Sequence, residues 1–379
     1  MRCIQTLLIL LIVFNCKVAF GQKSSIQTDI EGRFQNLIDS FYNAHPQTKG
    51  IAMCIEAPDR SISWCGAIGN ANSAGLKLTP DIPANIASNT KTYVAAAIIR
   101  LVELNKLKLD QPIRGLISHH NDSLLSADHY DLSSITVLHL LSNTSGIFDF
   151  VNTDRFQQMT VSEPYHHWTR DEQIALAISD GDLMWAPGAQ FSYSETNYSL
   201  LTEIIERLTG KPFYVAMREL LHFQELELNH TWFILQEKQP ERVSALAEQF
   251  ATKYKVNSLT LDPSFDAFGG GGLASTVSDL ARFTYYLFNG KVFENIESVP
   301  LMLTETATQD EIPSKYYMGI QEREIGGLKT YGHGGFWGTT VQYFPDLNTS
   351  IAVFLMERDE WPVYLELIAK VTEVLEQRK

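Results

Sequence analysis

Ser88 and Lys91 stand three residues apart in the stretch Ser88-Asn89-Thr90-Lys91. The apolar residues that follow recur at helical spacing, which predicts a helix that begins at or near Ser88. Residues three apart share one face of a helix, and the free N–H groups of the first turn favour negative charge there. Because Lys91 can hold or take the serine proton, Ser88 is a candidate nucleophile.

A simpler interpretation is that Ser88 only caps the helix. Serine is a favoured N-cap residue, and about one chance match to S-x-x-K is expected in a chain of this length. The motif occurs once here. Its meaning therefore depends on the rest of the chain.

Two other patterns that carry chemistry are weak. The ten histidines are scattered, and neither H-E-x-x-H nor C-x-x-C occurs, so the sequence predicts no metal site and no cofactor. Four glycines at 269–272 are not followed by Gly-Lys-Ser/Thr. We therefore interpret them as backbone freedom near a cleft and not as a phosphate-binding loop.

The composition is that of a globular protein. The chain has 379 residues, 45% hydrophobic and 20% charged, which suggests two or three domains or one large domain with an insertion. The net charge of −14 argues against nucleic acid or an anionic membrane as the main partner.

The first 21 residues have the pattern of a secretory signal peptide. Arg2 precedes an apolar run at 7–14, and small residues up to Gly21 offer a cleavage site. The run is too short to span a membrane, and we expect no stable membrane anchor. A lipoprotein anchor at Cys16 is an alternative, although the residues before it suit it poorly. We therefore expect an exported protein, periplasmic or secreted.

Cys54 and Cys65 are the two cysteines that remain after cleavage. They lie in a predicted hairpin that turns at residues 59–60, and symmetric pairing places them opposite each other. Export makes a disulfide feasible. Two reduced, buried cysteines are the alternative, because cross-strand disulfide geometry is demanding.

The two ends of the chain have similar patterns. A capping-box pattern at 28–31 opens a helix that precedes the hairpin, and the last hundred residues form two further hairpins and a helix opened by Pro362. We expect an α+β fold in which residues 28–87 and 262–379 form one antiparallel sheet flanked by the N- and C-terminal helices. Residues 88–261 are expected to form an inserted, mostly helical domain.

This layout and the short motifs within it resemble the penicillin-recognising serine hydrolases, which include class C β-lactamases, D-alanyl-D-alanine carboxypeptidases, esterases and D-aminopeptidases. Ser88-Asn89-Thr90-Lys91 matches the first motif. Tyr193-Ser194-Glu195 stands where the family has Tyr-x-Asn, and His333-Gly334-Gly335 where it has Lys-Thr-Gly or His-Thr-Gly. Weaker familial segments follow the expected order, at 107–112, 139–146, 187–188 and 275–280. The resemblance covers nearly the whole chain after residue 21 and implies the β-lactamase/transpeptidase-like fold.

The resemblance also implies roles. Ser88 would attack a carbonyl and form an acyl-enzyme, while Lys91 and Tyr193 share the proton, first as base and then as acid. A tyrosinate is plausible only beside a cation, which Lys91 supplies. The backbone N–H groups of Ser88 and Phe336 would form the oxyanion hole. Taken alone, Tyr193 would first be interpreted as a core aromatic residue with a satisfied hydroxyl, and His333 as a structural histidine at a strand end.

Substrate-binding positions depart from the family pattern. In relatives the Asn amide donates to a substrate carbonyl, whereas ionised Glu195 only accepts and would also pair with Lys91 and keep it protonated. Gly334 lacks the hydroxyl, and neutral His333 lacks the charge, with which the third motif grips a substrate carboxylate. Gly335 follows the pattern.

The sequence therefore predicts an exported serine hydrolase that acts on a small-molecule or peptide ester or amide. It leaves open a carboxylesterase, a D-amino-acid peptidase, a carboxypeptidase and a β-lactamase. A different class, a sensor that is acylated without turnover, remains an alternative because of Glu195. The sequence does not determine the oligomeric state.

Overall fold

The computed structural model describes residues 25–306 and 315–377. The predicted signal peptide over residues 1–21 lies outside this part of the chain. The first helix, α1, begins at Ser25, which is upstream of the start predicted at Thr28. Within the described residues, no helix is both long and apolar enough to cross a bilayer.

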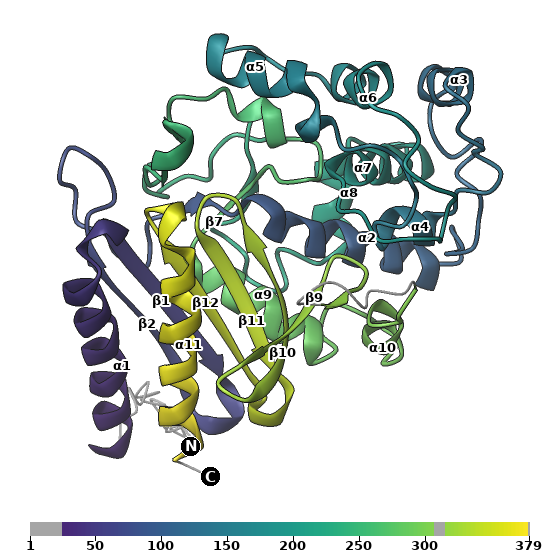
Figure 1. Ribbon diagram of the computed structural model, residues 1–379. Coiled ribbons are helices and arrows are strands. Elements are labelled where there is room, and N and C mark those ends of the chain that lie inside the picture. The colour runs from purple at the N-terminus through teal and green to yellow at the C-terminus, as the bar shows by residue number, and fades with distance from the viewer. Residues whose placement is uncertain (1–24, 307–314, 378–379) are drawn as a thin grey trace, which may run out of the picture.

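A seven-stranded antiparallel sheet is built from both ends of the chain, in the order β2-β1-β12-β11-β10-β9-β8 (Figure 1). Pairing of β1 with β12 joins the N-terminal hairpin to the C-terminal strands. The predicted hairpin register is confirmed, with Cys54 opposite Cys65. The strands are β1 (Gly50–Ala57), β2 (Ile62–Gly69), β8 (Lys315–Tyr316), β9 (Gln321–Ile325), β10 (Leu328–Gly335), β11 (Thr339–Phe344) and β12 (Thr349–Leu355).

Helices cover both faces of this sheet. Figure 1 shows α1 (Ser25–Ala44) and α11 (Trp361–Glu376) side by side on one face, where the two helices contact each other. Alternation along β1 explains the layering. Ile51 and Met53 join the core under α1 and α11, whereas Ala52 joins the core on the other face, where α9 (Val277–Phe288) packs. The molecule is thus an α+β fold.

The middle of the chain is mostly helical. Helix α2 lies at its centre, and every residue from Thr90 to Leu101 is buried. Helix α7 ends at Gly210, whose left-handed φ of 69° suits a residue without a side chain. The helices of this part are α2 (Thr90–Glu103), α3 (His119–Ala127), α4 (Val137–Leu141), α5 (Asp154–Ser162), α6 (Arg170–Ser179), α7 (Glu195–Thr209) and α8 (Phe213–Leu220), with α10 (Ser298–Met302) following α9.

A small sheet connects this helical part to the segment before Ser88. It consists of β3 (Ala84–Asn85), β7 (Leu273–Ser275) and β4 (Trp232–Phe233) in the order β3-β7-β4. Pairing of β3 with β7 brings the four-glycine run at 269–272 beside the start of α2. A separate two-stranded ribbon is formed by β5 (Phe250–Ala251) and β6 (Val256–Asn257).

Candidate active site

Ser88 lies in a 3-10 turn, η3 (Ala87–Asn89), that leads directly into α2. Ala87 has a φ of +45°, a conformation that residues with a side chain rarely adopt and that often marks a functional turn. The N-cap position of α2 is Asn89, which makes no side-chain capping bond. The Ser88 hydroxyl instead contacts Lys91 and Glu195, so a capping role does not account for it.

Lys91 is fully buried and has three polar partners. Its Nζ lies 3.2 Å from Oγ of Ser88, 2.5 Å from Oε2 of Glu195 and 2.5 Å from the carbonyl oxygen of Gly270. An ammonium group has three hydrogens to donate, and a carboxylate and a carbonyl can only accept. The arrangement therefore suits a protonated Lys91, and it forms the ion pair with Glu195 that the sequence allowed.

Glu195 is the first residue of α7 and joins the nucleophile to the lysine. While Oε2 pairs with Lys91, Oε1 lies 3.5 Å from Oγ of Ser88. The N-terminus of a helix favours a negative charge. The backbone N–H of Glu195 donates to Asp149 at 3.1 Å, which fixes the start of the helix. One carboxylate thus spans Ser88 and Lys91.

Tyr193 lies close to the lysine. Lys91 Nζ is 4.9 Å from the centre of its ring, and its hydroxyl is hydrogen-bonded to Ser88. Desolvation raises the pKa of Tyr193 well above its ordinary value, and the negative charge of Glu195 raises it further. The tyrosinate considered from the sequence is therefore disfavoured, because the charge of Lys91 is already offset by Glu195.

The third motif lies at the end of β10. His333 is buried, with Nδ1 2.7 Å from the carbonyl oxygen of Gly334, so Nδ1 carries the ring hydrogen. Burial, with the charge of Lys91, lowers the pKa of His333 to about 3. The neutral imidazole assumed from the sequence is thus the form present at ordinary pH. A side chain at Gly335 would lie 2.3 Å from the carbonyl oxygen of Ile86, which shows how closely β10 approaches the Ser88 turn.

Phe336 follows this strand directly, so the two predicted oxyanion N–H groups lie on adjoining segments. The Arg358 guanidinium sits 4.3 Å from the centre of the Phe336 ring. Beside them opens a cavity of about 650 Å³ that contains a second guanidinium, that of Arg323. Its other lining residues include Gly334, Thr339, Trp361 and Tyr364.

Two acids of the site were not found from the sequence. Buried Asp149 accepts from the backbone N–H of Glu195, and burial, with the charge of Glu195, raises its pKa to about 7. Desolvation and Glu195 raise the pKa of Asp266 well above its ordinary value. No local pattern marks Asp149. Asp266 stands just before the four glycines, and that proximity was the available signal.

The glycine run allows the backbone to approach these acids. A Cβ at Gly270 would lie 1.9 Å from Oε2 of Glu195, and one at Gly271 would lie 1.8 Å from Oδ2 of Asp266. In the structure, the absence of side chains at these glycines lets the backbone lie in close contact with the carboxylates. Across residues 25–306 and 315–377, no group of three or more His, Cys, Asp or Glu residues is arranged to hold a metal ion.

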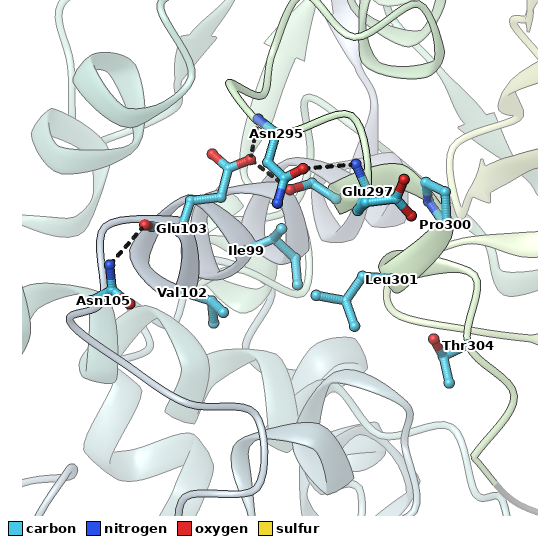
Figure 2. Close-up of a pocket in the computed structure, with 10 residues that line it drawn as sticks. Ile99, Val102, Glu103, Asn105, Asn295, Glu297, Pro300, Leu301 and Thr304 are labelled. Atoms are coloured by element: carbon cyan, nitrogen blue, oxygen red, sulfur yellow. Dashed lines mark hydrogen bonds between the residues drawn. The ribbon is translucent and has the colours of Figure 1, made fainter.

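A second cavity, of about 530 Å³, lies away from this chemistry at the C-terminal end of α2 (Figure 2). There Glu103 accepts from the backbone N–H of Asn295 at 3.0 Å and from the Ser298 hydroxyl. At 1.5 Å per residue, Glu103 is roughly 18 Å along the helix from Lys91. These contacts tie α10 to α2 and take no part in the site.

Comparison with known proteins shows the family and the fold of this chain. A model of the family described as Beta-lactamase matches residues 35–371. The "Putative D-alanyl-D-alanine carboxypeptidase" of Escherichia coli (strain K12) is 24% identical over 322 residues, 76% of this chain and 72% of that protein. Protein flp of Staphylococcus aureus (strain MW2) is 29% identical over 161 residues, 42% of this chain but only 29% of flp. The D-amino acid amidase of Ochrobactrum anthropi SV3 superposes with a TM-score of 0.76 at 21% identity, over 92% of this chain and 99% of that chain.

Proposed function

This chain belongs to the β-lactamase family, and from that premise we propose that it is an exported serine hydrolase that cleaves an ester or amide through an acyl-Ser88 intermediate. The observation that carries the proposal is the contact of Ser88 Oγ with Lys91 Nζ at 3.2 Å, in a turn that opens a helix. A nucleophile beside a buried cation and a proton acceptor is the arrangement that acyl transfer needs. Export rests on residues 1–21 alone.

In this proposal Oγ of Ser88 attacks the substrate carbonyl, and the hydroxyl proton of Ser88 passes to a basic side chain beside it. The backbone N–H groups of Ser88 and Phe336 stabilise the oxyanion. Tyr193, as a neutral phenol hydrogen-bonded to Ser88, is placed to donate a proton to the leaving group. Water then releases the acyl group and restores Ser88.

The residues of the third motif favour a substrate that has no carboxylate facing His333 and Gly334. Uncharged His333 and Gly334, which has no hydroxyl, offer little to an anion. A simple ester needs only the nucleophile, its proton acceptor and donor, and the oxyanion N–H groups. We therefore favour esterase activity within the family.

A D-alanyl-D-alanine carboxypeptidase is the second candidate, and the cavity beside Phe336 favours it. Arg323 and Arg358 both line this cavity, and guanidinium groups pair well with carboxylates. They would compensate for the changes in the third motif. The Escherichia coli relative carries that activity in its name.

The test combines active-site labelling with a substrate panel. The protein purified without residues 1–21 is treated with a fluorophosphonate, and hydrolysis of p-nitrophenyl acetate, a D-phenylalanine amide, a diacyl D-Ala-D-Ala peptide and nitrocefin is measured. We expect labelling at Ser88, turnover of the ester, and loss of both in Ser88→Ala without loss of folding. Wild-type hydrolysis by Ser88→Ala would contradict the proposal, and a stable acyl adduct without turnover would indicate a sensor.

A further inference from the structure

We propose that Glu195 is the catalytic base of this protein, taking the proton of Ser88 in acylation and that of water in deacylation. The inference rests on the proposed hydrolase function and assigns to Glu195 the role that the family resemblance gives to Lys91 and Tyr193. It starts from the hydrogen-bond geometry around Ser88 Oγ. Oε1 of Glu195 lies 3.5 Å from that oxygen, while Oε2 is held by Lys91.

Lys91 is poorly placed to accept a proton, because the groups around its Nζ accept hydrogen bonds from it. Two of its partners, the Glu195 carboxylate and the Gly270 carbonyl, lie at 2.5 Å and can only accept. A third contact reaches Ser88 Oγ at 3.2 Å. In this proposal Lys91, ion-paired with Glu195, serves as a donor that stabilises negative charge on the serine oxygen. With Lys91 donating to that oxygen, the serine hydrogen is free to point toward Glu195.

The surroundings of Tyr193 disfavour it as the base, although its interaction with Ser88 acts in the opposite direction. A base must be a tyrosinate, and desolvation together with Glu195 raises the pKa of this hydroxyl well above its ordinary value. The phenol retains its hydrogen and can still donate it. Tyr193 thus keeps only the acid half of the role that the resemblance implied.

Two other acids, Asp149 and Asp266, lie near Glu195. Desolvation and the charge of Glu195 raise the pKa of both Asp149 and Asp266. These two acids therefore tend to stay protonated and add little negative charge next to Glu195. Glu195 is the carboxylate that directly contacts the buried cation. The charged and titratable groups that face this region are Lys91 on α2, Asp149, Asp266, Tyr193, Tyr198 on α7, Tyr316 on β8 and His333 on β10.

The proton balance closes without any other reactant. In acylation, the Oγ–C bond forms, the Ser88 proton moves to Oε1 of Glu195, and the bond to the leaving group breaks. The leaving group receives a proton from the Tyr193 phenol, and the proton held by Glu195 then passes through water to restore that phenol. In deacylation, water forms the new C–O bond and gives a proton to Glu195, and Ser88 Oγ takes that proton as its bond to the acyl carbon breaks.

The experiment measures kcat/KM for p-nitrophenyl acetate from pH 5 to 10 in wild type, Glu195→Gln and Tyr193→Phe. Glutamine keeps the size of the side chain but cannot accept the proton. We expect Glu195→Gln to lose about 100-fold or more at pH 7, the usual range for loss of a general base. The dependence of its kcat/KM on pH should also differ from that of wild type, because the group that takes the serine proton is missing.

Tyr193→Phe gives an independent test that does not depend on the folding of the first variant. Because p-nitrophenolate and fluoride leave without protonation, this variant should keep ester turnover within about tenfold and should still be labelled by a fluorophosphonate. Glu206→Gln is the matched control. Glu206 is another carboxylate of α7, and it pairs with Arg170 at 2.6 Å instead of contacting Ser88.

Two results would overturn the inference. One is an unchanged pH profile in folded Glu195→Gln, and the other is loss of labelling in Tyr193→Phe. These two results can be told apart from a failure of the proposed hydrolase function. In that case the wild-type protein itself would be neither labelled nor active.

Discussion

The carbonyl oxygen of Gly270 accepts a 2.5 Å hydrogen bond from Nζ of Lys91, although the two residues are 179 positions apart in the chain. Pairing of β3 with β7 makes this contact possible, because it fixes the four-glycine run against the segment before Ser88. The glycine backbone thereby completes the set of three acceptors around the lysine. The glycine run is therefore part of the site.

Gly270→Ala should strongly reduce activity. The new Cβ would meet Oε2 of Glu195 at 1.9 Å, so the carboxylate or the loop must shift away from Lys91. Overpacking of this kind typically costs about 1–3 kcal/mol of stability. The measurement is ester turnover together with the urea midpoint. Gly32→Ala is the control, because nothing lies within 4 Å of its added Cβ, and it should leave turnover unchanged.

Asp149→Asn should change how stability depends on pH. The native pKa of Asp149 is about 7 against an ordinary 3.8, so between these values the folded protein holds a proton that the unfolded chain has lost. This group therefore stabilises the fold at low pH, and that contribution is lost as pH rises toward 7, at about 1.4 kcal/mol per pKa unit.

The amide introduced by Asp149→Asn does not titrate, yet its oxygen can accept the same backbone hydrogen bonds. We therefore expect the unfolding midpoint of the variant to rise relative to wild type as the pH increases from 4 to 7. Parallel curves for the two proteins over this range would show that Asp149 does not carry the raised pKa.

Cys54 and Cys65 should be joined by a disulfide in protein isolated under oxidising conditions. The structure pairs them as a disulfide across β1 and β2, and the residues are 11 positions apart. Because the closed loop is short, the bond should add roughly 2–3 kcal/mol at most. Thiol titration of unreduced, denatured protein should find neither cysteine, and two free thiols would contradict the prediction. Cys54→Ser with Cys65→Ser should fold with a lower midpoint.

Glu195→Asn should shift substrate preference toward β-lactams. A β-lactam presents a side-chain carbonyl to the second motif, where an amide can donate a hydrogen bond and a carboxylate cannot. A hydrogen bond of this kind is worth about 1 kcal/mol, so the expected change is several-fold. The measurement is the ratio of kcat/KM for p-nitrophenyl acetate over nitrocefin, taken with enough enzyme to measure the residual turnover of the variant. An unchanged ratio, or a wild type that already prefers nitrocefin, would rule out Glu195 as the specificity element.

The sequence by itself determined those features that depend on local order. The spacing of Ser88 and Lys91 and the apolar period after them located the start of α2, because a helix is defined by its own few residues. The hairpin register that places Cys54 opposite Cys65 followed from a short turn for the same reason. The order of the three motifs then indicated the family and its fold.

Only the tertiary structure decided which side chains of the site hold protons. Protonation states depend on burial and on charges within a few ångströms, which come here from residues far apart in the chain. Asp149 had no recognisable pattern and Asp266 had only the neighbouring glycines, yet the charge of Glu195 raises the pKa of both. Desolvation and the charge of Glu195 keep Tyr193 a phenol, whereas burial and the charge of Lys91 keep His333 neutral.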